Sequence, residues 1–150
     1  MVYLTGDTHN EFTRLSNKYF KKYDLEIGEN DYIIVCGDLG LCWSKDKTFE
    51  WNCKWFAEKP YTLLWVQGNH ENYDMLKRIP AVSWKGGKAQ FITPSIIRLM
   101  RGQVYDIGGV RFFTFGGAAS HDIDGGILEP DDPDFKRKKR ELDRGWKPYR

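Results

Sequence analysis

Five side chains that could bind metal ions or phosphate follow three short apolar stretches of the chain. Each group begins directly after a glycine, and the five residues are Asp7 and His9, then Asp38, then Asn69 and His70. Carboxylate and amide oxygens combined with imidazole nitrogen, without thiolates, suit divalent ions such as manganese, iron or zinc. The sequence therefore indicates a candidate metal site, which needs a fold that brings three distant segments together.

The spacing of these groups indicates which elements position them. Asp38 lies 31 residues after Asp7, and Asn69 lies 31 residues after Asp38. A strand, a helix and the next parallel strand take roughly 30 residues or more, so each interval fits one such unit. Three parallel strands would deliver all the groups to the carboxyl edge of a sheet, where open α/β sheets bind ligands.

The residue types allow two metal ions to be held. Asp7 and His9 are two positions apart, so an extended strand end would point both side chains to one side. They could hold one ion, while Asn69 could hold a second and Asp38 could bridge the two. Two ions roughly 3.5–4 Å apart can clamp a phosphate and lower the pKa of a bound water. His70 could then assist the leaving group as an acid or charge stabiliser.

Each motif has a plainer explanation when it is taken alone. Gly-Asp and Gly-Asn pairs after a strand are common turn dipeptides, and a single histidine is more often a surface residue than a ligand. The conjunction favours the metal site, because three successive strand ends repeat the pattern. Two of these strand ends add a histidine that turn formation does not require.

The order and spacing of three blocks resemble the calcineurin-like metallophosphoesterase superfamily. The blocks are Gly6-Asp7-Thr8-His9, Gly37-Asp38 and Gly68-Asn69-His70-Glu71, and residues 115–120 are similar to a segment of small bacterial and phage members. The resemblance implies a four-layer αββα sandwich and a dinuclear site that hydrolyses phosphomonoesters or phosphodiesters. It assigns Asp7 and His9 to the first metal, Asp38 to the bridge, Asn69 to the second metal and His70 to the leaving group.

The later histidine blocks of that superfamily have no counterpart here. The chain contains three histidines in total, and the one that remains, His121, is not in a matching context. It could approach the site or be an ordinary loop residue, and we do not assign it as a ligand. The resemblance implies the N-terminal part of such an enzyme, truncated at its C-terminus. We expect the second metal to be held weakly and the activity of this chain to be weak or absent.

Apolar periodicity and turn signals predict a single domain of mixed α/β structure. Helices are expected over residues 13–23, 48–58, 72–78 and 135–143. Strand-like runs at 96–100, 103–107 and 110–115, the last two flanking Gly108-Gly109, predict antiparallel strands in a mixed sheet or in a second sheet. Residues 81–89 and 122–134 are interpreted as loops.

Two segments follow the second predicted strand and its candidate ligand Asp38. Residues 39–44 are glycine-containing and aromatic, and they could form a pocket wall or simply pack on the domain. The helix over residues 48–58 carries an apolar stripe flanked by Trp51 and Trp55. Such a wide apolar face predicts deep burial.

Composition indicates an ordinary globular protein of 150 residues, with 41% hydrophobic and 29% charged residues. No stretch approaches the ~20 apolar residues of a membrane span. A strand that begins at Val2 leaves no room for a secretory signal. Three cysteines without a CxxC pair suggest reduced thiols, so we expect a cytoplasmic location.

Two competing functions remain open at this point. Residues 135–150 carry eight basic and two acidic residues, which gives this segment a net charge of +6. Because the net charge of the whole chain is +2, residues 1–134 carry −4. Such a basic end could bind nucleic acid, although it lacks interleaved aromatic residues and fits a solvated helix face better. A non-catalytic interaction module that keeps the phosphoesterase fold is the other alternative. Unpaired sheet edges also lead us to expect a homodimer.

Overall fold

The computed structural model describes residues 1–117 and 128–145. Two compact units are distinguished, Met1–Gly117 and Ala118–Arg150. The elements of the first unit are β1 (Val2–Thr5), η1 (Thr13–Leu15), α1 (Asn17–Lys22), β2 (Tyr32–Cys36), α2 (Lys47–Ala57), β3 (Thr62–Val66), α3 (Tyr73–Lys77), β4 (Ala81–Trp84), β5 (Gly87–Thr93), β6 (Ile96–Leu99), β7 (Gln103–Ile107) and β8 (Val110–Thr114). The described part of the second unit contains α4 (Phe135–Asp143).

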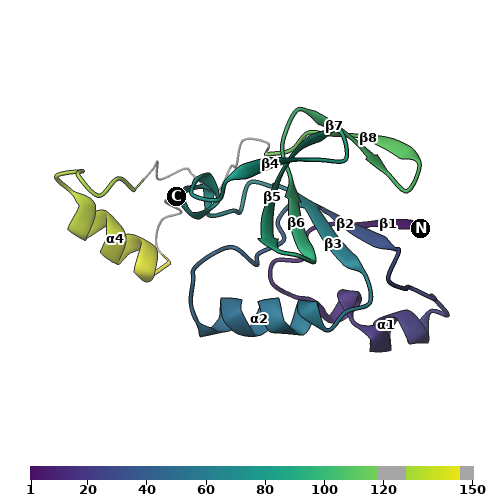
Figure 1. Ribbon diagram of the computed structural model, residues 1–150. Helices are drawn as coiled ribbons and strands as arrows, with labels where there is room; N and C mark the ends of the chain where they lie inside the picture. The colour runs from purple at the N-terminus through teal and green to yellow at the C-terminus, as the bar shows by residue number, and fades with distance from the viewer. Residues whose placement is uncertain (118–127, 146–150) are drawn as a thin grey trace. The chain divides into compact units, whose positions relative to one another are not determined.

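A six-stranded mixed sheet forms the centre of the first unit, with the strand order β1-β2-β3-β6-β5-β4 (Figure 1). Strands β1, β2, β3 and β6 are parallel, whereas β5 runs antiparallel to both of its neighbours. Thr5 pairs with Val35 in β2, which in turn pairs with Trp65 in β3, so the first three strands end level with one another. The prediction of three successive parallel strands is therefore confirmed.

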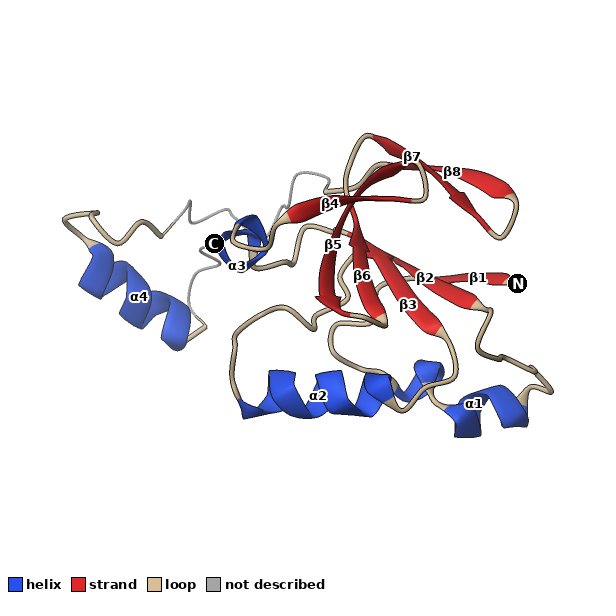
Figure 2. Ribbon diagram, in the orientation of Figure 1, coloured by secondary structure: helices blue, strands red, loops and turns tan. Residues whose placement is uncertain are grey.

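Both faces of the central strands are buried. In β3, Leu63 and Trp65 belong to one apolar cluster, whereas Leu64 and Val66 belong to another. Successive side chains of a strand point to opposite faces, and this places one cluster under the helices and one under the β7–β8 hairpin. Figure 2 shows α1 and α2 on one side of the sheet and the hairpin on the other. Within residues 1–117 the layers are thus helix, sheet and second sheet, and the expected mixed α/β class is confirmed.

Aromatic contacts fill the cluster between the sheet and the helices. The rings of Phe12 and Phe56 have their centroids 4.9 Å apart, and those of Phe20 and Tyr61 are 5.8 Å apart. The buried hydroxyl of Tyr61 donates a hydrogen bond of 2.6 Å to the carbonyl oxygen of Leu15. This packing fixes η1 and α2 against the strands that lead to the candidate site.

Residues 81–89 are not the loop that their composition predicted. They contain β4 and the start of β5, with Trp84 paired to Gly87 across a two-residue turn. The turn residues Lys85 and Gly86 have φ values of 46° and 95°, as a two-residue hairpin turn that twists with its strands requires. Because β4 is an exposed edge strand of the sheet, it lacks the apolar pattern by which buried strands are identified.

The helix predicted over residues 13–23 is divided into η1 and α1. Ser16 interrupts it with extended backbone angles, φ −90° and ψ 148°. The Ser16 hydroxyl oxygen accepts a hydrogen bond of 3.2 Å from the backbone N–H of Tyr19. Serine competes for backbone groups in this way and favours helix starts over helix interiors.

The helix predicted over residues 48–58 is α2, but it is not buried all round. Trp51 is 62% exposed, whereas Phe56 and the polar residue Asn52 are buried. The helices predicted over residues 72–78 and 135–143 are confirmed as α3 and α4. The hairpin predicted around Gly108-Gly109 is confirmed as β7 and β8.

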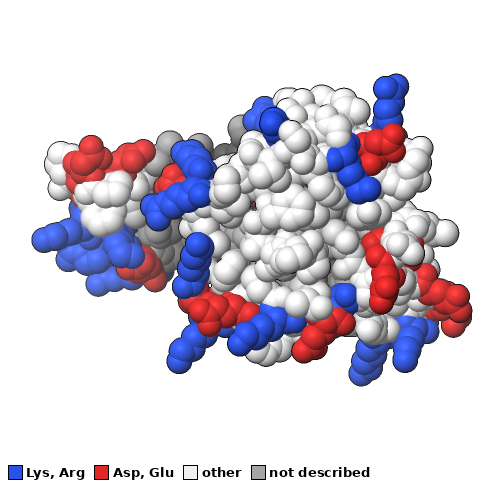
Figure 3. Space-filling view, in the orientation of Figure 1, with Lys and Arg blue, Asp and Glu red and all other residues white. Residues whose placement is uncertain are grey.

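Acidic neighbours accompany the basic residues of α4. Arg137 forms ion pairs of 2.8 Å with Asp134 and 2.7 Å with Glu141, and Lys139 pairs with Asp143 at 3.2 Å. Lysine and arginine side chains gather over this helix with carboxylates beside them (Figure 3). The pattern is typical of a solvated helix face. Among the described helices, none combines the length and the apolar character needed to cross a membrane.

Candidate metal centre

Backbone hydrogen bonds join the turns that follow the first three strands. The N–H of Asp7 donates to the Gly37 carbonyl oxygen at 3.1 Å, and the N–H of Gly37 donates to Val66 at 2.9 Å. The N–H of His9 reaches the carbonyl oxygen of Asp38 at 2.8 Å. The segments predicted to carry the site therefore lie side by side at the carboxyl edge of the sheet.

Left-handed backbone conformations are concentrated in these turns. Asp7, His9 and Asp38 have φ values of 61°, 44° and 49°. Aspartate and histidine adopt this region more readily than most residues, yet each such position costs on the order of 1–3 kcal/mol. Strained backbone of this kind clusters at functional sites, where the surrounding structure holds it in place.

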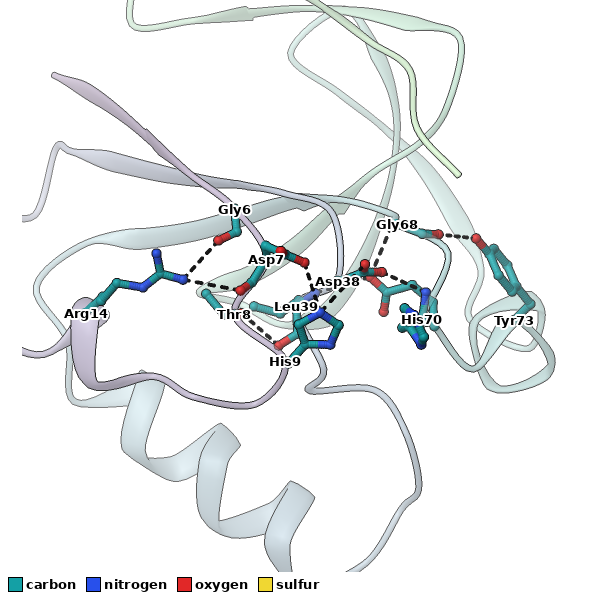
Figure 4. Close-up of polar contacts among 11 residues, drawn as sticks. Gly6, Asp7, Thr8, His9, Arg14, Asp38, Leu39, Gly68, His70 and Tyr73 are labelled. Carbon is teal, nitrogen blue, oxygen red and sulfur yellow. Dashed lines mark hydrogen bonds and ion pairs between the residues drawn. The ribbon is translucent and has the colours of Figure 1, made fainter. Parts of the chain in front are cut away.

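Asp7, His9 and Asp38 bring three possible ligand atoms within 4.8 Å of one another. His9 Nε2 lies 2.9 Å from Asp7 Oδ1 and 4.0 Å from Asp38 Oδ2. Figure 4 shows these side chains pointing toward one another from adjacent turns. The side chains of Asp7 and His9 are 75% and 52% exposed, whereas that of Asp38 is 11% exposed. Two carboxylates and one imidazole at this spacing fit a divalent cation.

The carboxylate of Asp38 faces two strand ends at once. Its Oδ1 accepts a hydrogen bond of 2.7 Å from the backbone N–H of His70, while its Oδ2 faces His9. Gly68 makes this position possible, because a Cβ atom there would lie 2.0 Å from Asp38 Oδ1. The glycine before Asn69 therefore leaves room for a carboxylate of the neighbouring strand.

His70 and Asn69 follow Gly68 in the same turn. The His70 ring lies edge-on to the His9 ring, with their centroids 5.3 Å apart. Asn69 is half-buried and lies between the two residues whose backbones approach the Asp38 carboxylate. The predicted roles of Asn69 as a metal ligand and His70 as a leaving-group residue stay predictions. His121 lies outside the described residues.

Glu71 is a buried carboxylate to which the sequence assigned no role. Its Oε1 accepts long hydrogen bonds of 3.4 Å from the backbone N–H groups of Gly68 and Leu39. Burial raises the pKa of the Glu71 carboxyl, although these two N–H groups oppose the rise. Glu71 thereby connects the turns that carry Asp38 and His70. The sequence signal that could have identified Glu71 is its position directly after the Gly68-Asn69-His70 block.

Further contacts hold the first turn in place. The Thr8 hydroxyl, which is buried, donates to the Leu39 carbonyl oxygen at 2.9 Å. Arg14 Nη2 donates to the carbonyl oxygens of Gly6 at 3.0 Å and Asp7 at 3.3 Å. These bonds satisfy backbone groups at the strand end without occupying the side chains that could bind metal.

A cavity of about 380 Å³ opens beside the metal centre and is lined in part by His9 and His70. The loop between β2 and α2 forms another part of its wall through Trp43 and Ser44. Leu41, earlier in the same loop, is buried in the apolar cluster under the helices. Both roles left open for this loop by the sequence are therefore realised, since Leu41 packs on the domain and also lines the pocket together with Trp43 and Ser44.

Comparison with protein families agrees with this fold. The family model of the calcineurin-like phosphoesterases matches residues 1–147 of the chain. No curated protein and no solved structure shows significant similarity to it. Because the match covers nearly the whole chain, the protein belongs to the calcineurin-like phosphoesterase family, whose members typically use divalent metal ions.

Proposed function

We propose that the protein is a metal-dependent phosphoesterase that hydrolyses phosphomonoesters or phosphodiesters. The observation that carries the proposal is the cluster of Asp7, His9 and Asp38 within 4.8 Å, at the sheet edge of a chain that belongs to the calcineurin-like phosphoesterase family. Exposed acidic groups alone would not suffice, but the convergence of carboxylates and an imidazole from adjacent strand ends is the donor set that a divalent cation needs.

The proposed centre is dinuclear. Asp7 and His9 would hold one ion, Asn69 the other, and Asp38 would bridge them, with manganese, iron or zinc as the fitting metals. Bound ions of this kind neutralise phosphate charge and lower the pKa of a bound water. The exposed side of the centre, where the Asp7 and His9 side chains remain accessible, is open to a phosphate group.

His70 is the proposed residue for the leaving group. Its ring lies beside that of His9, and it lines the cavity next to the cluster. An imidazole in this place could donate a proton or a hydrogen bond to the oxygen that departs with the alcohol. The backbone N–H of His70 also donates a hydrogen bond to Asp38 and holds that carboxylate in position, independently of the imidazole.

A comparison of two aspartate variants tests the proposal. The metal-free protein is loaded with manganese or zinc, and hydrolysis of p-nitrophenyl phosphate and bis-p-nitrophenyl phosphate is measured. We expect weak metal-dependent turnover that falls at least about 100-fold in Asp38→Asn, since metal-assisted stabilisation is worth several kcal/mol. The matched control is Asp106→Asn, an exposed carboxylate on β7. A folded protein that neither binds metal nor hydrolyses either ester would instead be a non-catalytic module.

Partners and location are also proposals. A phosphoester is the proposed substrate, and association into a homodimer through exposed sheet edges is proposed from the arrangement of the strands. Nucleic-acid binding is less favoured, because acidic neighbours pair with Arg137 and Lys139 of α4. A cytoplasmic location is proposed from the three free cysteines.

A further inference from the structure

Trp43 is a large aromatic side chain that remains 60% exposed on the wall of the cavity beside the metal centre. The two residues before it, Leu41 and Cys42, are 3% and 1% exposed, so the chain enters this position from the core. An indole face left open to solvent costs hydrophobic stabilisation, and in a cavity it offers a surface on which a flat group can stack.

Both sides of the Trp43 position are held by hydrogen bonds. The Trp43 carbonyl oxygen accepts a bond of 2.5 Å from Asn72 Nδ2, and Asn72 Oδ1 caps α3 by accepting from the N–H of Met75 at 2.9 Å. On the other side, Asp46 Oδ1 caps α2 by accepting from the N–H of Phe49 at 2.9 Å. The loop is thereby tied to the segment that follows His70, and the backbone from which the indole projects is held in place.

The remaining walls of the cavity combine apolar residues, Leu41 and Phe49, with polar side chains, and they carry little charge. Asn52, which is 5% exposed, donates from Nδ2 to Asn10 Oδ1 at 2.9 Å, so two amide side chains on the lining of the cavity are joined to each other. Apart from the two histidines, the ionisable lining residue is Asp46. Its carboxylate is engaged by the Ser44 hydroxyl and the helix N–H groups, which lower its pKa. The residues that line this cavity include neither lysine nor arginine.

We propose that this cavity receives a planar aromatic leaving group of the phosphoester, such as a nucleoside or an aryl alcohol, stacked on Trp43. The inference rests on the proposed phosphoesterase function, because it places the ester bond at the metal centre and the departing alcohol between Trp43 and His70. The fixed amides of Asn10 and Asn52 can form hydrogen bonds with the edge of a heteroaromatic ring. Additional phosphates would find no cationic partner there, so polyphosphorylated substrates fit poorly.

Equilibrium binding to the metal-free protein tests the cavity without relying on catalysis. Adenosine and phenol are titrated into the wild-type protein, and binding is followed by nuclear magnetic resonance. Stacking of a base on an aromatic side chain corresponds to about a 5- to 150-fold change in affinity when that side chain becomes alanine. We therefore expect Trp43→Ala to weaken binding by such a factor and Trp43→Phe to restore most of it.

Trp51→Ala is the matched control for the binding experiment. Trp51 is 62% exposed on the nearby helix α2 but does not line the cavity. The Trp51→Ala substitution should leave the binding of adenosine and phenol unchanged. Equal losses in the Trp43 and Trp51 variants, or no saturable binding of either compound, would overturn the inference. Binding of adenosine alone would support the inference and indicate that the amides form hydrogen bonds with the edge of the ring. Binding of both compounds would support it and indicate that stacking makes the main contribution.

Kinetics with metal-loaded protein separate this inference from the proposed function. The preference for adenosine 5′-monophosphate and p-nitrophenyl phosphate over glycerol 2-phosphate is measured as a ratio of kcat/KM values. We expect Trp43→Ala to lower that ratio at least about 5-fold. Hydrolysis of all three esters with an unchanged ratio would refute the cavity assignment and leave the phosphoesterase standing. If no ester is hydrolysed, the phosphoesterase proposal fails, and the binding titration still tests whether the cavity binds aromatic compounds.

Discussion

Asp38 is the residue on which the candidate metal centre depends most. It is nearly buried, and its two carboxylate oxygens face different strand ends, one toward the His70 N–H and one toward His9. Asp7 and His9 are exposed and lie on one side of it. The candidate centre thus combines one fixed carboxylate with two accessible side chains that could bind a metal ion.

The two histidines are expected to respond differently to substitution. His9→Asn should weaken manganese or zinc binding at least about 10-fold, since losses of that size follow even when an indirect partner of a metal ligand is removed. His70→Asn should keep metal affinity, because the substitution leaves intact the backbone N–H that donates to Asp38. The kcat of the His70→Asn variant should fall about 10²- to 10⁴-fold, as expected when a general acid is removed. Calorimetric metal titration and steady-state kinetics separate these effects, and equal metal losses in both variants would contradict the assignment.

Gly68 should be intolerant of any side chain. A Cβ atom would lie 2.0 Å from Asp38 Oδ1 and 2.5 Å from the Asp38 backbone nitrogen, so Gly68→Ala must displace the carboxylate or the strand end. We expect the free energy of unfolding to fall by more than about 2 kcal/mol, as for other core clashes, together with weaker metal binding. Gly28→Ala is the control, because a Cβ atom at that position meets nothing within 4 Å. Urea unfolding measures both variants, and similar stabilities would argue against the close approach.

At the scale of the elements, a hydrogen bond from the buried residue Tyr61 links the helical layer to the sheet. Tyr61 precedes β3 and donates its hydroxyl hydrogen bond to Leu15 in η1, a segment that follows the Asp7–His9 turn. Burial raises the pKa of the Tyr61 phenol above its ordinary value near 10. Because the folded state resists ionisation of this group, it contributes stability that is fully present below pH ~10 and is lost as the pH rises further.

Replacing this hydroxyl should change the alkaline limb of the stability profile. Tyr61→Phe is expected to cost about 1 kcal/mol at neutral pH, since the hydrogen bond to Leu15 is lost. Above pH ~10 the stability of the variant should fall less steeply than that of the wild type, because residue 61 no longer ionises on unfolding. Tyr23→Phe, at a 51% exposed position, is the control. Denaturant unfolding between pH 7 and 11 measures the difference, and parallel pH profiles would contradict the prediction.

At the scale of the first unit, sheet edges and large apolar side chains are exposed among the described residues. Strands β1 and β4 are the outermost strands of the six-stranded sheet. Phe113 in β8 and Phe115 directly after that strand are 67% and 64% exposed, and their rings stack at a centroid distance of 6.2 Å. Exposed edges and apolar strand faces promote association between chains.

Self-association is accordingly expected to depend on these phenylalanines. The double substitution Phe113→Thr and Phe115→Thr should shift the protein toward monomer at a given concentration, because threonine keeps strand propensity while removing apolar area. Trp51→Thr removes a comparably exposed aromatic residue from α2 and should leave association unchanged. Light scattering over a concentration series provides the measurement. A wild-type protein that stays monomeric at every concentration would refute the expectation.

The sequence by itself determined the candidate ligand types, their equal spacing and the apolar character of the first three strands. These features are local or periodic, so glycine turns and apolar stretches predicted the level strand ends that collect Asp7, His9 and Asp38. The β7–β8 hairpin was predictable for the same reason, because Gly108-Gly109 between two strand-like runs is a local signal.

Only the tertiary structure decided the features that depend on contacts between distant segments. Strand β4 has an exposed edge position that leaves no apolar pattern, so residues 81–89 were misinterpreted as loop. Glu71 became a connector because folding places Leu39 and Gly68 beside it. The exposure of Trp43 and Trp51 differs from the burial that their residue type favours, since burial depends on which neighbours the fold supplies. Local pattern sets elements and spacing, whereas long-range packing sets edges, cavities and side-chain partners.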